Sequence, residues 1–512
     1  MTLSVYTLCE FRNLNPVGFC GICGFCGELQ AKEIQAKKIQ AKEILGVILP
    51  KEPHRNGYLF VMAKVRTKSA NLRKYMDFLT IKRQTLAFSK ENTYICKNIT
   101  YSKVIFMIVQ FSVGNYLSFK ELSTLSLVTT NLKETAIPET DSMTEMGDAI
   151  PAVLHGAAIY GANASGKSNF AKAFSTFKWL VINSMKELQA GETLNVESFM
   201  LNAATAKEPS VFEIVFCNTA YIFRYGFEVD SNKVHKEWLY RRNNKKRAKE
   251  VELLYREEDT YNVHPSCAIA KNLIANKMVR DNALLVSVAA QFNDETAVSI
   301  VNWLNDTSII TSHDDEMMWK RAAVKLDDPK IRKRIVDFSR FADLGIEDIY
   351  KMNDEVVSSH VQYDDDGRET QTVSFPFENN ESEGTVKYFQ LAYPIINALD
   401  NGKRLVIDEI DSKMHPKLTS KIIELFNSKA TNPHHAQLIF TIHDTNILSA
   451  RILRRDQVWF TQKDTYGATK LYSLADYKVR NNASFEKEYL EGKYGGTPII
   501  GDFSKLFVNE ED

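Results

Sequence analysis

The sequence predicts an α/β fold with an antiparallel β subdomain and a helical insertion. Residues 153–186 read as a strand, a glycine-containing loop and a helix, the unit from which parallel sheets are commonly built. Residues 209–256 hold runs of aromatic and β-branched residues, which are typical of antiparallel strands. Residues 381–460 return to alternating helix and strand, so the mostly helical stretch at 265–345 is best explained as a segment inserted within one fold.

The first 106 residues differ from the rest of the chain in charge. The 512 residues carry 64 Lys and Arg and 64 Asp and Glu, which gives a net charge of zero. Residues 1–106 hold 17 basic and 7 acidic residues, whereas the remaining 406 hold 47 and 57. A body with a net charge of −10 argues against sequence-independent DNA binding by bulk charge, because such binding needs a positive surface.

This leader also contains simple tandem repeats. Cys20, Cys23 and Cys26 recur every three residues, and a Gln-Ala-Lys unit recurs every five residues from Gln30. A period of five matches neither a helix nor a strand. The cysteine spacing resembles that of metal-cluster ligands, but the repeats favour a disordered or mis-annotated leader over a metal site. We therefore predict that Met107 is the natural start or the first structured residue.

The composition favours a cytoplasmic protein without membrane contact. The longest apolar runs, such as residues 104–109, are far shorter than the roughly 20 residues that a membrane helix needs. Glu10 and Arg12 interrupt any secretory signal. Cys217 and Cys267 are too few for a disulfide framework in the body of the chain.

The body is predicted to have three parts after the leader at 1–106. An N-terminal lobe covers 107–256, a mainly helical insert covers 257–350, and a C-terminal lobe covers 351–512. The N-terminal lobe is expected to contain a strand at 107–113 and antiparallel strands at Val211–Asn218, Ala220–Glu228 and His235–Arg242. In the insert, Asp328 and Pro329 predict the N-cap and first turn of an amphipathic helix that extends to about residue 343.

Residues 161–168 form the most specific motif in the chain. The run Gly161-Ala-Asn-Ala-Ser-Gly-Lys-Ser168 fits G-x-x-x-x-G-K-[ST], with a strand at 157–160 before it and a helix at 169–185 after it. Glycines let backbone N–H groups surround a phosphate, and the helix N-terminus favours an anion. A glycine-containing turn before an ordinary helix is the alternative. The residues assigned to nucleotide binding are Gly161, Asn163, Ser165, Gly166, Lys167, Ser168 and Asn169.

A short apolar strand, Arg404-Leu-Val-Ile, ends in two acidic residues about 240 residues further along the chain. We expect Asp408 to hold Mg²⁺ opposite Ser168, and Glu409 to polarise the attacking water. Lys167 would reach the β- and γ-phosphates of the nucleotide. Two surface acids at a strand end are the alternative.

Two further polar segments complete the candidate site. His443 follows an apolar strand that begins at Gln437, and there it could sense the γ-phosphate. Ser382 and Gly384 precede a helix whose N-terminus could bind an anion. A structural histidine and a simple N-cap are the alternatives for these two segments.

Taken in order, these motifs resemble the ABC-type ATPases of the SMC/RecF/OLD class. They resemble more closely the bacterial stand-alone AAA-15/AAA-21 ATPases of abortive-infection and phage-defence operons (the AbiLii/RloA/AriA type). The resemblance runs from Met107 to about Phe503. It rests on the opening strand and turn up to Phe119, a divergent signature motif at Glu381–Thr385, Walker B and the D-loop at Asp408–Pro416, the switch histidine at Thr441–Asp444, and Tyr-Leu-x-Gly-x-Tyr-Gly at Tyr489–Gly495.

The resemblance implies a P-loop NTPase of ABC ATPase type that hydrolyses ATP with Mg²⁺ as a homodimer or higher oligomer. ATP on one subunit would be closed over by Ser382 and Gly384 of the other, while Glu409 orients water and His443 stabilises the γ-phosphate. Two features depart from the family. Leu117 stands where relatives often have Arg, and residues 199–202 lack the expected Q-loop glutamine.

The resemblance further implies a sensor or regulator in an anti-phage, abortive-infection system. Only 69 residues follow His443, so we expect a nuclease or toxin effector to be a separate polypeptide. The absence of LSGGQ argues against a transporter ATPase, and the absence of N-K-x-D after Asp408 argues against a GTPase. The alternative is a RecF/SMC-like DNA-repair ATPase that binds DNA. A basic run at 241–249 could contact nucleic acid, or it could be a solvated turn beside acidic residues.

Overall fold

A computed structural model describes residues 106–132, 142–311, 314–342, 345–479 and 483–498. All of them lie within one compact unit, Tyr101–Asp512. The predictions for the leader, including its repeats, its cysteines and a start at Met107, concern residues 1–105 and lie outside the described residues. The division of the body at 256 and 350 stays a prediction, because the described residues form a single unit.

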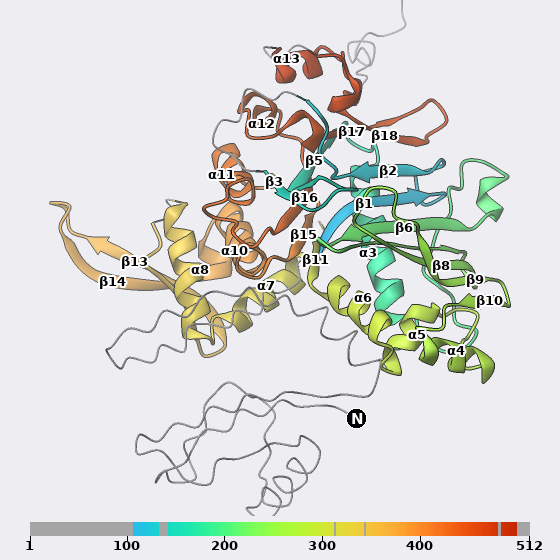
Figure 1. Cartoon of the computed structure of the whole chain (residues 1–512). Helices are drawn as coiled ribbons and strands as arrows, with labels where there is room; N and C mark the ends of the chain where they lie inside the picture. The colour runs from blue at the N-terminus through green and yellow to red at the C-terminus, as the bar shows by residue number, and fades with distance from the viewer. Residues whose placement is uncertain (1–105, 133–141, 312–313, 343–344, 480–482, 499–512) are drawn as a thin grey trace, which may run out of the picture. The chain divides into compact units, whose positions relative to one another are not determined.

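The first sheet is antiparallel throughout, with the strand order β10-β9-β8-β7-β6-β1-β2 (Figure 1). Alternate residues of β6 are buried, as expected for a sheet with one face on the core. The strands predicted at 107–113 and between 211 and 242 are confirmed. The strands of this sheet are β1 (Met107–Gly114), β2 (Ser123–Ser126), β6 (Ser210–Cys217), β7 (Tyr221–Val229), β8 (Val234–Asn243), β9 (Val251–Glu257) and β10 (Thr260–Val263).

The second sheet has the order β11-β15-β16-β5-β17-β18, and every pair is parallel except β17 with β18. Its four inner strands are almost fully buried, which agrees with the continuous apolar runs of their sequences. The strands of this sheet are β5 (Gly156–Gly161), β11 (Thr307–Ile310), β15 (Arg404–Ile407), β16 (Gln437–Thr441), β17 (Val458–Lys463) and β18 (Thr469–Ser473).

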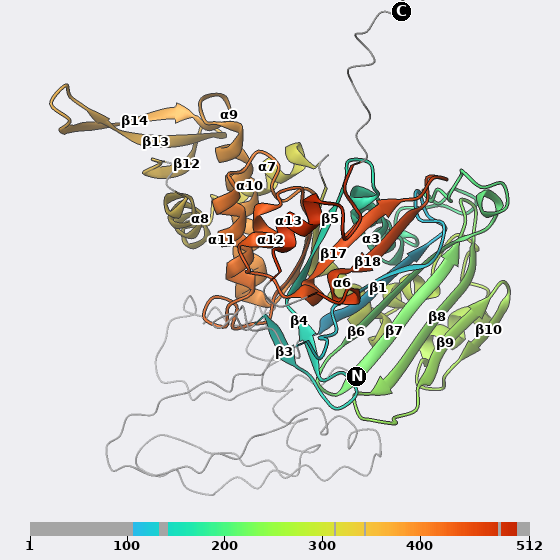
Figure 2. The ribbon, with the colours of Figure 1, turned by 90° about the horizontal axis from the view of Figure 1, so that it is seen from above.

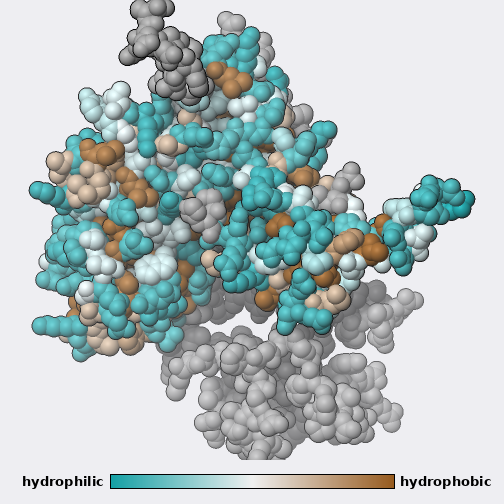
Figure 3. Space-filling model, turned by 180° about the vertical axis from the view of Figure 1, so that it is seen from behind, coloured by the Kyte–Doolittle hydropathy of each residue, from teal (hydrophilic) through white to brown (hydrophobic). Residues whose placement is uncertain are grey.

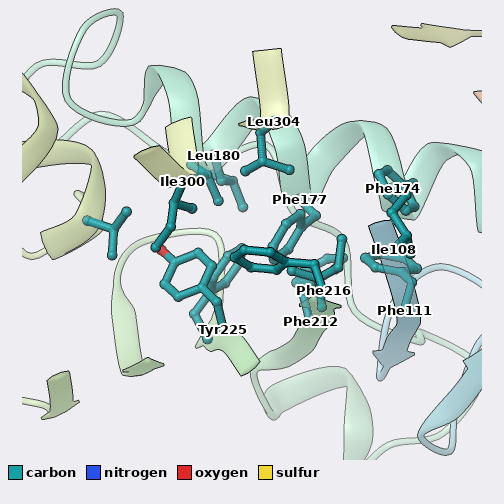
Figure 4. Close-up of a cluster of buried hydrophobic side chains, with 14 of the residues drawn as sticks. Ile108, Phe111, Phe174, Phe177, Leu180, Phe212, Phe216, Tyr225, Ile300 and Leu304 are labelled. Carbon is teal, nitrogen blue, oxygen red and sulfur yellow. The ribbon is translucent and has the colours of Figure 1, made fainter. Parts of the chain in front are cut away.

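Helix α3 (Lys167–Asn183) packs between the two sheets. Its aromatic residues Phe170, Phe174 and Phe177 surround Phe111 of β1. Figure 4 shows this core continuing from Phe177 to Phe212 and Tyr225 of the antiparallel sheet. Helices α4 (Ala268–Ala275), α5 (Leu285–Gln291) and α6 (Glu295–Asn305) extend the same core. Helix α3 therefore links both sheets to the loop that the sequence predicts to bind phosphate, Gly161–Ser168, called the phosphate loop below.

The other face of the parallel sheet is covered by α10 (Glu383–Asn401), α11 (Pro416–Phe426) and α12 (Asn446–Ser449). Helices α7 (Asp315–Lys325) and α8 (Pro329–Phe341) pack against α10. The predicted helix at Pro329 is confirmed, and Asp328 caps it by accepting from the N–H groups of Lys330 and Ile331. Among the described helices, none is long and apolar enough to cross a membrane.

The sequence did not indicate two sets of strands, one within the predicted helical insert and one at and beyond its end at residue 350. Strand β11 joins the edge of the parallel sheet beside β15. Strands β12 (Asp348–Met352), β13 (Glu355–Tyr363) and β14 (Glu369–Pro376) form a small antiparallel sheet, and their hairpin extends away from α8 and α10 (Figures 1 and 2). The end of this hairpin is hydrophilic (Figure 3), because its turn contains Asp364, Asp365 and Asp366.

The remaining elements are short. Strands β3 (Met143–Glu145) and β4 (Ala152–Leu154) pair with each other, and α9 (Phe377–Asn380) follows β14. Helix α13 (Phe485–Leu490) lies near the end of the described chain. The 3₁₀ helices are η1 (Thr205–Lys207), η2 (Arg455–Gln457) and η3 (Leu474–Asp476).

Candidate functional site

The site is set by the carboxyl ends of β5, β15 and β16, which are neighbours in the parallel sheet. Thr441 of β16 pairs with Ile159, and Ile407 of β15 pairs with Phe440, so the three strands end at the same edge. In open α/β sheets, ligands bind in the crevice outside this edge. The loops that begin at Gly161, Asp408 and Ile442 therefore converge, as the motifs predicted.

The phosphate loop is held tightly against β17 and β18. A Cβ atom on Gly161 would lie 2.6 Å from the carbonyl oxygen of Thr461, and one on Gly166 would lie 2.7 Å from Cγ2 of Thr469. Gly166, the N-cap of α3, also has a φ of 113°, which a larger residue rarely adopts. Gly161 is thus required by its close approach to the Thr461 backbone, and Gly166 by its contact with the Thr469 side chain and by its φ.

Two threonines hold this loop in shape. The hydroxyl of Thr461 lies 2.7 Å from that of Ser165, and the hydroxyl of Thr469 lies 2.8 Å from the carbonyl oxygen of Ser165. Asn169 donates from its side chain to Ser118 Oγ in the opening turn. Asn163 is exposed, and Ser168 is partly exposed at the start of α3. The loop therefore keeps its outer surface open while its inner surface is bonded to the sheet.

Lys167 is buried at the mouth of the loop. Its Nζ donates to the carbonyl oxygens of Gly161 at 2.6 Å and Ala162 at 3.1 Å. Burial lowers the pKa of Lys167 to about 8, and the nearby carboxylates of Glu409 and Asp408 oppose this lowering. An ammonium group that is held by weak carbonyl acceptors can transfer its hydrogen bonds to a more negative ligand.

The opening turn lies on the segment that connects α3 to β6. The side chain of Asn115 donates to the carbonyl oxygens of Thr205 and Glu208, and it accepts from the N–H of Phe199. The N–H of Leu117 donates to Glu197. This packing places Phe199 and the residues around it against the opening turn that contains Asn115 and Leu117.

Asp408 and Glu409 follow directly from the end of β15. Asp408 is 2% exposed, and its Oδ1 accepts from the hydroxyl of Thr441 at 2.7 Å. The same hydroxyl accepts from the N–H of Glu409 at 2.7 Å. Glu409 has a φ of 53°, a left-handed conformation that costs about 1 kcal/mol or more for a residue with a side chain. Backbone strain of this kind is typical of functional positions.

His443 lies beside Glu409, with 4.0 Å between its Nε2 and Glu409 Oε1. The histidine side chain is 40% exposed, so it faces the open edge of the sheet. The backbone N–H groups of His443 and Asp444 both donate to Asp411 Oδ2. The structure thus brings Lys167, Glu409 and His443 to one edge of the sheet.

The predicted signature motif occupies the start of α10. Ser382 is the N-cap and accepts from the N–H of Thr385 at 3.1 Å. A Cβ on Gly384 would lie 2.6 Å from the carbonyl oxygen of Lys413, so this turn packs on the loop that follows Asp408. Among the described residues, neither Ser382 nor Gly384 forms a hydrogen bond with the phosphate loop of its own chain.

The residue before the signature motif is anchored to the hairpin. Glu381 accepts from Ser358 Oγ at 2.5 Å, and its Oε1 lies 2.7 Å from His360 Nε2, both on β13.

The basic run at 241–249 lies at the turn between β8 and β9. There Arg241 lies over the ring of Tyr221, and Glu250 bonds to Arg224.

Sequence reasoning missed the residues that position the predicted ones. Thr441 and Thr469 lie at the ends of strands, Thr461 lies within β17, and Asp411 lies three residues after Asp408. Thr441 and Asp411 fall within motifs already singled out, so their polar character in otherwise apolar surroundings was the available signal. Thr461 and Thr469 carry no local signal, because their partners lie about 300 residues away in the sequence.

A protein-family model described as an AAA domain, putative AbiEii toxin, type IV toxin–antitoxin system, matches residues 157–449. No protein with a curated description matches the chain. The SMC head domain from Thermotoga maritima is similar, with 15% identity and a TM-score of 0.31 over 73% of this chain and 99% of that one. The recombination mediator RecF in complex with ATPrS is similar over 72% of this chain and 98% of that one, with 12% identity and a TM-score of 0.26.

Proposed function

We propose that this chain, which belongs to the AAA-domain family of the putative AbiEii toxin type, is an ABC-type ATPase that binds ATP with Mg²⁺ and hydrolyses it. The observation that best supports this proposal is the convergence of three groups at one sheet edge. These groups are the phosphate loop with Lys167, the Asp408–Glu409 pair, and His443. Each comes from a different strand end, and each has a separate role in phosphoryl transfer.

The phosphates of ATP would bind at Gly161–Ser168. The N–H groups of the loop and the N-terminus of α3 favour an anion there. Lys167 would exchange the carbonyl oxygens of Gly161 and Ala162 for phosphate oxygens, which are stronger acceptors. Asn163, exposed at the tip of the loop, would lie nearest the phosphates.

Ser168 and Asp408 fit a magnesium ion, because hydroxyl and carboxylate oxygens are the donors that this ion prefers. Asp408 is buried and its carboxylate is oriented by Thr441, so its position is fixed before any ligand binds. Magnesium, when bound, would neutralise part of the charge on the phosphates.

For hydrolysis, Glu409 would accept a hydrogen bond from the attacking water and orient it toward the γ-phosphorus. The water oxygen would bond to the γ-phosphorus as the P–O bond to the leaving ADP oxygen breaks, a proton of the water would pass to Glu409, and inorganic phosphate would be released. His443, near Glu409, would donate to a γ-phosphate oxygen. The Glu409 side chain is 37% exposed, which leaves it accessible to a water at this edge and supports this role.

We further infer that the active form is a homodimer or higher oligomer. Ser382 is exposed at the N-terminus of the 19-residue helix α10, where it is available to a nucleotide on another subunit. Ser382 and Gly384 of one chain would then close over the ATP of the next. ATP would therefore promote dimerisation.

The variant Glu409→Gln tests the enzymatic proposal. ATP affinity should change less than about threefold, whereas turnover should fall about 100-fold or more, the effect expected for loss of a general base. Glu424→Gln on the surface of α11 is the matched control, and it should hydrolyse ATP at the wild-type rate. Equal turnover in Glu409→Gln and wild type would remove Glu409 from the mechanism.

The biological role that we propose is that of a sensor or regulator in a phage-defence system, with a separate effector. The description of the family as a toxin–antitoxin component supports this role. Cells that carry the intact operon should plate phage poorly, and Glu409→Gln in this chain should change plating efficiency. Identical plating in the two strains would contradict a defence role that depends on ATP hydrolysis.

A further inference from the structure

The loop that carries His443 is held from one side by Asp411. A single oxygen, Oδ2, accepts from the N–H of His443 at 2.9 Å and from the N–H of Asp444 at 2.8 Å. Hydrogen bonds to a charged acceptor are roughly twice as strong as neutral ones, so this pair fixes the backbone from which the imidazole projects. Asp411 itself follows β15 closely, which ties the loop to the Asp408–Glu409 strand end.

The same loop is held from its other side by the C-terminal part of the chain. Thr445 donates from its hydroxyl to Glu486 Oε1 on α13 at 3.2 Å. Glu486 lies 41 residues further along the sequence, so this bond links two distant segments. The loop that carries His443 is therefore hydrogen-bonded to Asp411 through residues 443 and 444 and to Glu486 through Thr445.

Helix α13 is made rigid by the aromatic motif that follows Glu486. The ring of Tyr489 stacks on Phe460 at 5.3 Å and meets Tyr160 edge-on at 6.0 Å. The hydroxyls of Tyr472 and Tyr477 both donate to the carbonyl oxygen of Tyr494. These contacts show that the motif at Tyr489–Gly495 packs α13, the helix that carries Glu486, against β5, β17 and β18.

Three buried side-chain oxygens near the loop that carries His443 have no hydrogen-bond partner among the described residues. They are the hydroxyl of Tyr160, Asp411 Oδ1 and Asp444 Oδ2. Burial, followed by the charges of Asp444 and Asp411, raises the pKa of Tyr160 well above its ordinary value, so the phenol remains a donor. Tyr160 directly precedes Gly161 of the phosphate loop, and a shift of the loop would let one of these carboxylates accept from it.

We propose that Asp411 and Glu486 are positioning residues for His443, and that the C-terminal aromatic motif Tyr489–Gly495 thereby controls the rate of ATP hydrolysis. The proposal rests on the function proposed above for His443. Neither residue is assigned to ATP binding. Both act on the backbone of residues 442–446. In a second conformation of that loop, the unpartnered Tyr160 hydroxyl would donate to the carboxylate of Asp411 or Asp444.

Hydrogen exchange of the nucleotide-free full chain tests the positioning directly. Amides of His443 and Asp444 should exchange about fivefold faster or more in Asp411→Ala, because both lose their acceptor. Glu486→Ala and Thr445→Val should accelerate the same peptide severalfold. Thr445→Ser and Glu486→Gln keep a donor and an acceptor, so they should match wild type, as should Lys487→Ala on the exposed side of α13. Unchanged exchange in all three disruptive variants would overturn the proposal.

Steady-state kinetics then test the link to turnover. In Glu486→Ala and Thr445→Val, kcat should fall about fivefold while ATP affinity stays within about twofold of wild type. The double variant should be no slower than the slower single variant, because both changes remove one shared bond. Multiplicative losses, or a kcat equal to wild type, would contradict the coupling. If the wild-type chain releases no phosphate, the proposed ATPase function fails separately, and the exchange data alone decide the positioning.

Discussion

Glu237 in the antiparallel sheet and Asp408 at the edge of the parallel sheet are both buried carboxylates, at 0% and 2% exposure. Glu237 accepts from Tyr225 Oη and from the N–H groups of Leu285 and Val286, so it caps α5 with both oxygens. The carboxylate of Asp408 is bonded to the Thr441 hydroxyl, at Oδ1. A buried acid with both oxygens bonded to its own fold is structural, whereas one oriented by a single hydroxyl at an open sheet edge is suited to a ligand.

Two lysines of α3 repeat this contrast. Burial lowers the pKa of both Lys167 and Lys178 to about 8. Lys178 donates to the carbonyl oxygen of Thr307 and so fastens α3 to β11. Lys167 bonds only to carbonyl oxygens of its own loop, as far as the described residues show. A shifted pKa therefore does not separate structural from functional groups, but the identity of the hydrogen-bond partner does.

The largest effect on stability is expected from a change at Glu237, the structural acid. Glu237→Ala should destabilise the protein by about 4 kcal/mol, because it leaves two N–H groups and the Tyr225 hydroxyl without an acceptor in the core. The midpoint of thermal unfolding measures this loss. ATP affinity of the folded protein should remain at the wild-type value, and reduced affinity at unchanged stability would break the contrast with Asp408.

The next largest effect is expected on ATP affinity, from a change at Lys167 of the phosphate loop. Lys167→Ala should weaken ATP binding about 100-fold or more, because a buried ammonium that contacts phosphate is lost. Lys178→Ala is its matched control on the same helix, and it should lower stability without changing ATP affinity. Titration calorimetry with ATP measures both. Equal affinities in the two variants would show that the phosphate loop is placed wrongly.

A smaller effect is the pH dependence of stability that arises from the buried His155. Burial lowers the pKa of His155 to about 4, with His435 adding to the shift and the bond to the Phe426 carbonyl opposing it. Between pH 6.5 and 4 the unfolded chain binds more protons at this residue than the folded chain, so stability falls as the pH falls. From pH 7.5 to 5 the loss should be about 2 kcal/mol.

Thermal unfolding at the two pH values measures this term. His155→Gln should lose the His155 part of the pH dependence, since glutamine does not titrate. The exposed His264→Gln should retain it. An identical pH dependence in wild type and His155→Gln would contradict burial of a neutral histidine at this position.

The smallest effect is expected at Thr441. Thr441→Val should lower kcat about fivefold, because Asp408 and Glu409 lose the hydroxyl that orients them. Thr441→Ser keeps the hydroxyl and should restore most of the rate. Steady-state hydrolysis measures the difference, and a full rate in Thr441→Val would mean that strand β16 alone fixes the two acids.

Local patterns predicted the segments that converge at the sheet edge better than they predicted the fold around them. The strand, loop and helix of Gly161–Lys167 are adjacent in sequence, so spacing and residue type sufficed to identify them. Strand β11 was missed because four residues, Thr307–Ile310, lie between helices and gain their partner 97 residues later at Arg404. The hairpin of β13 and β14 was missed because β14 is exposed on both faces and shows no apolar alternation.

Partners that come from distant strands escaped prediction for the same reason. Thr461 and Thr469 shape the phosphate loop from about 300 residues away, and a threonine in a strand is unremarkable in sequence. Glu486 contacts Thr445 from α13, whose Tyr489 packs on Phe460 of β17. Such contacts depend on tertiary packing, which a single sequence does not display.

Phosphate release from ATP by the purified full chain, compared among wild type, Lys167→Ala and Lys178→Ala at equal concentrations of folded protein, tests the central claim most directly. Wild type and Lys178→Ala should release phosphate at similar rates per folded molecule, and Lys167→Ala should release none above background. Equal release by Lys167→Ala would contradict the assignment of this sheet edge as the site of ATP hydrolysis.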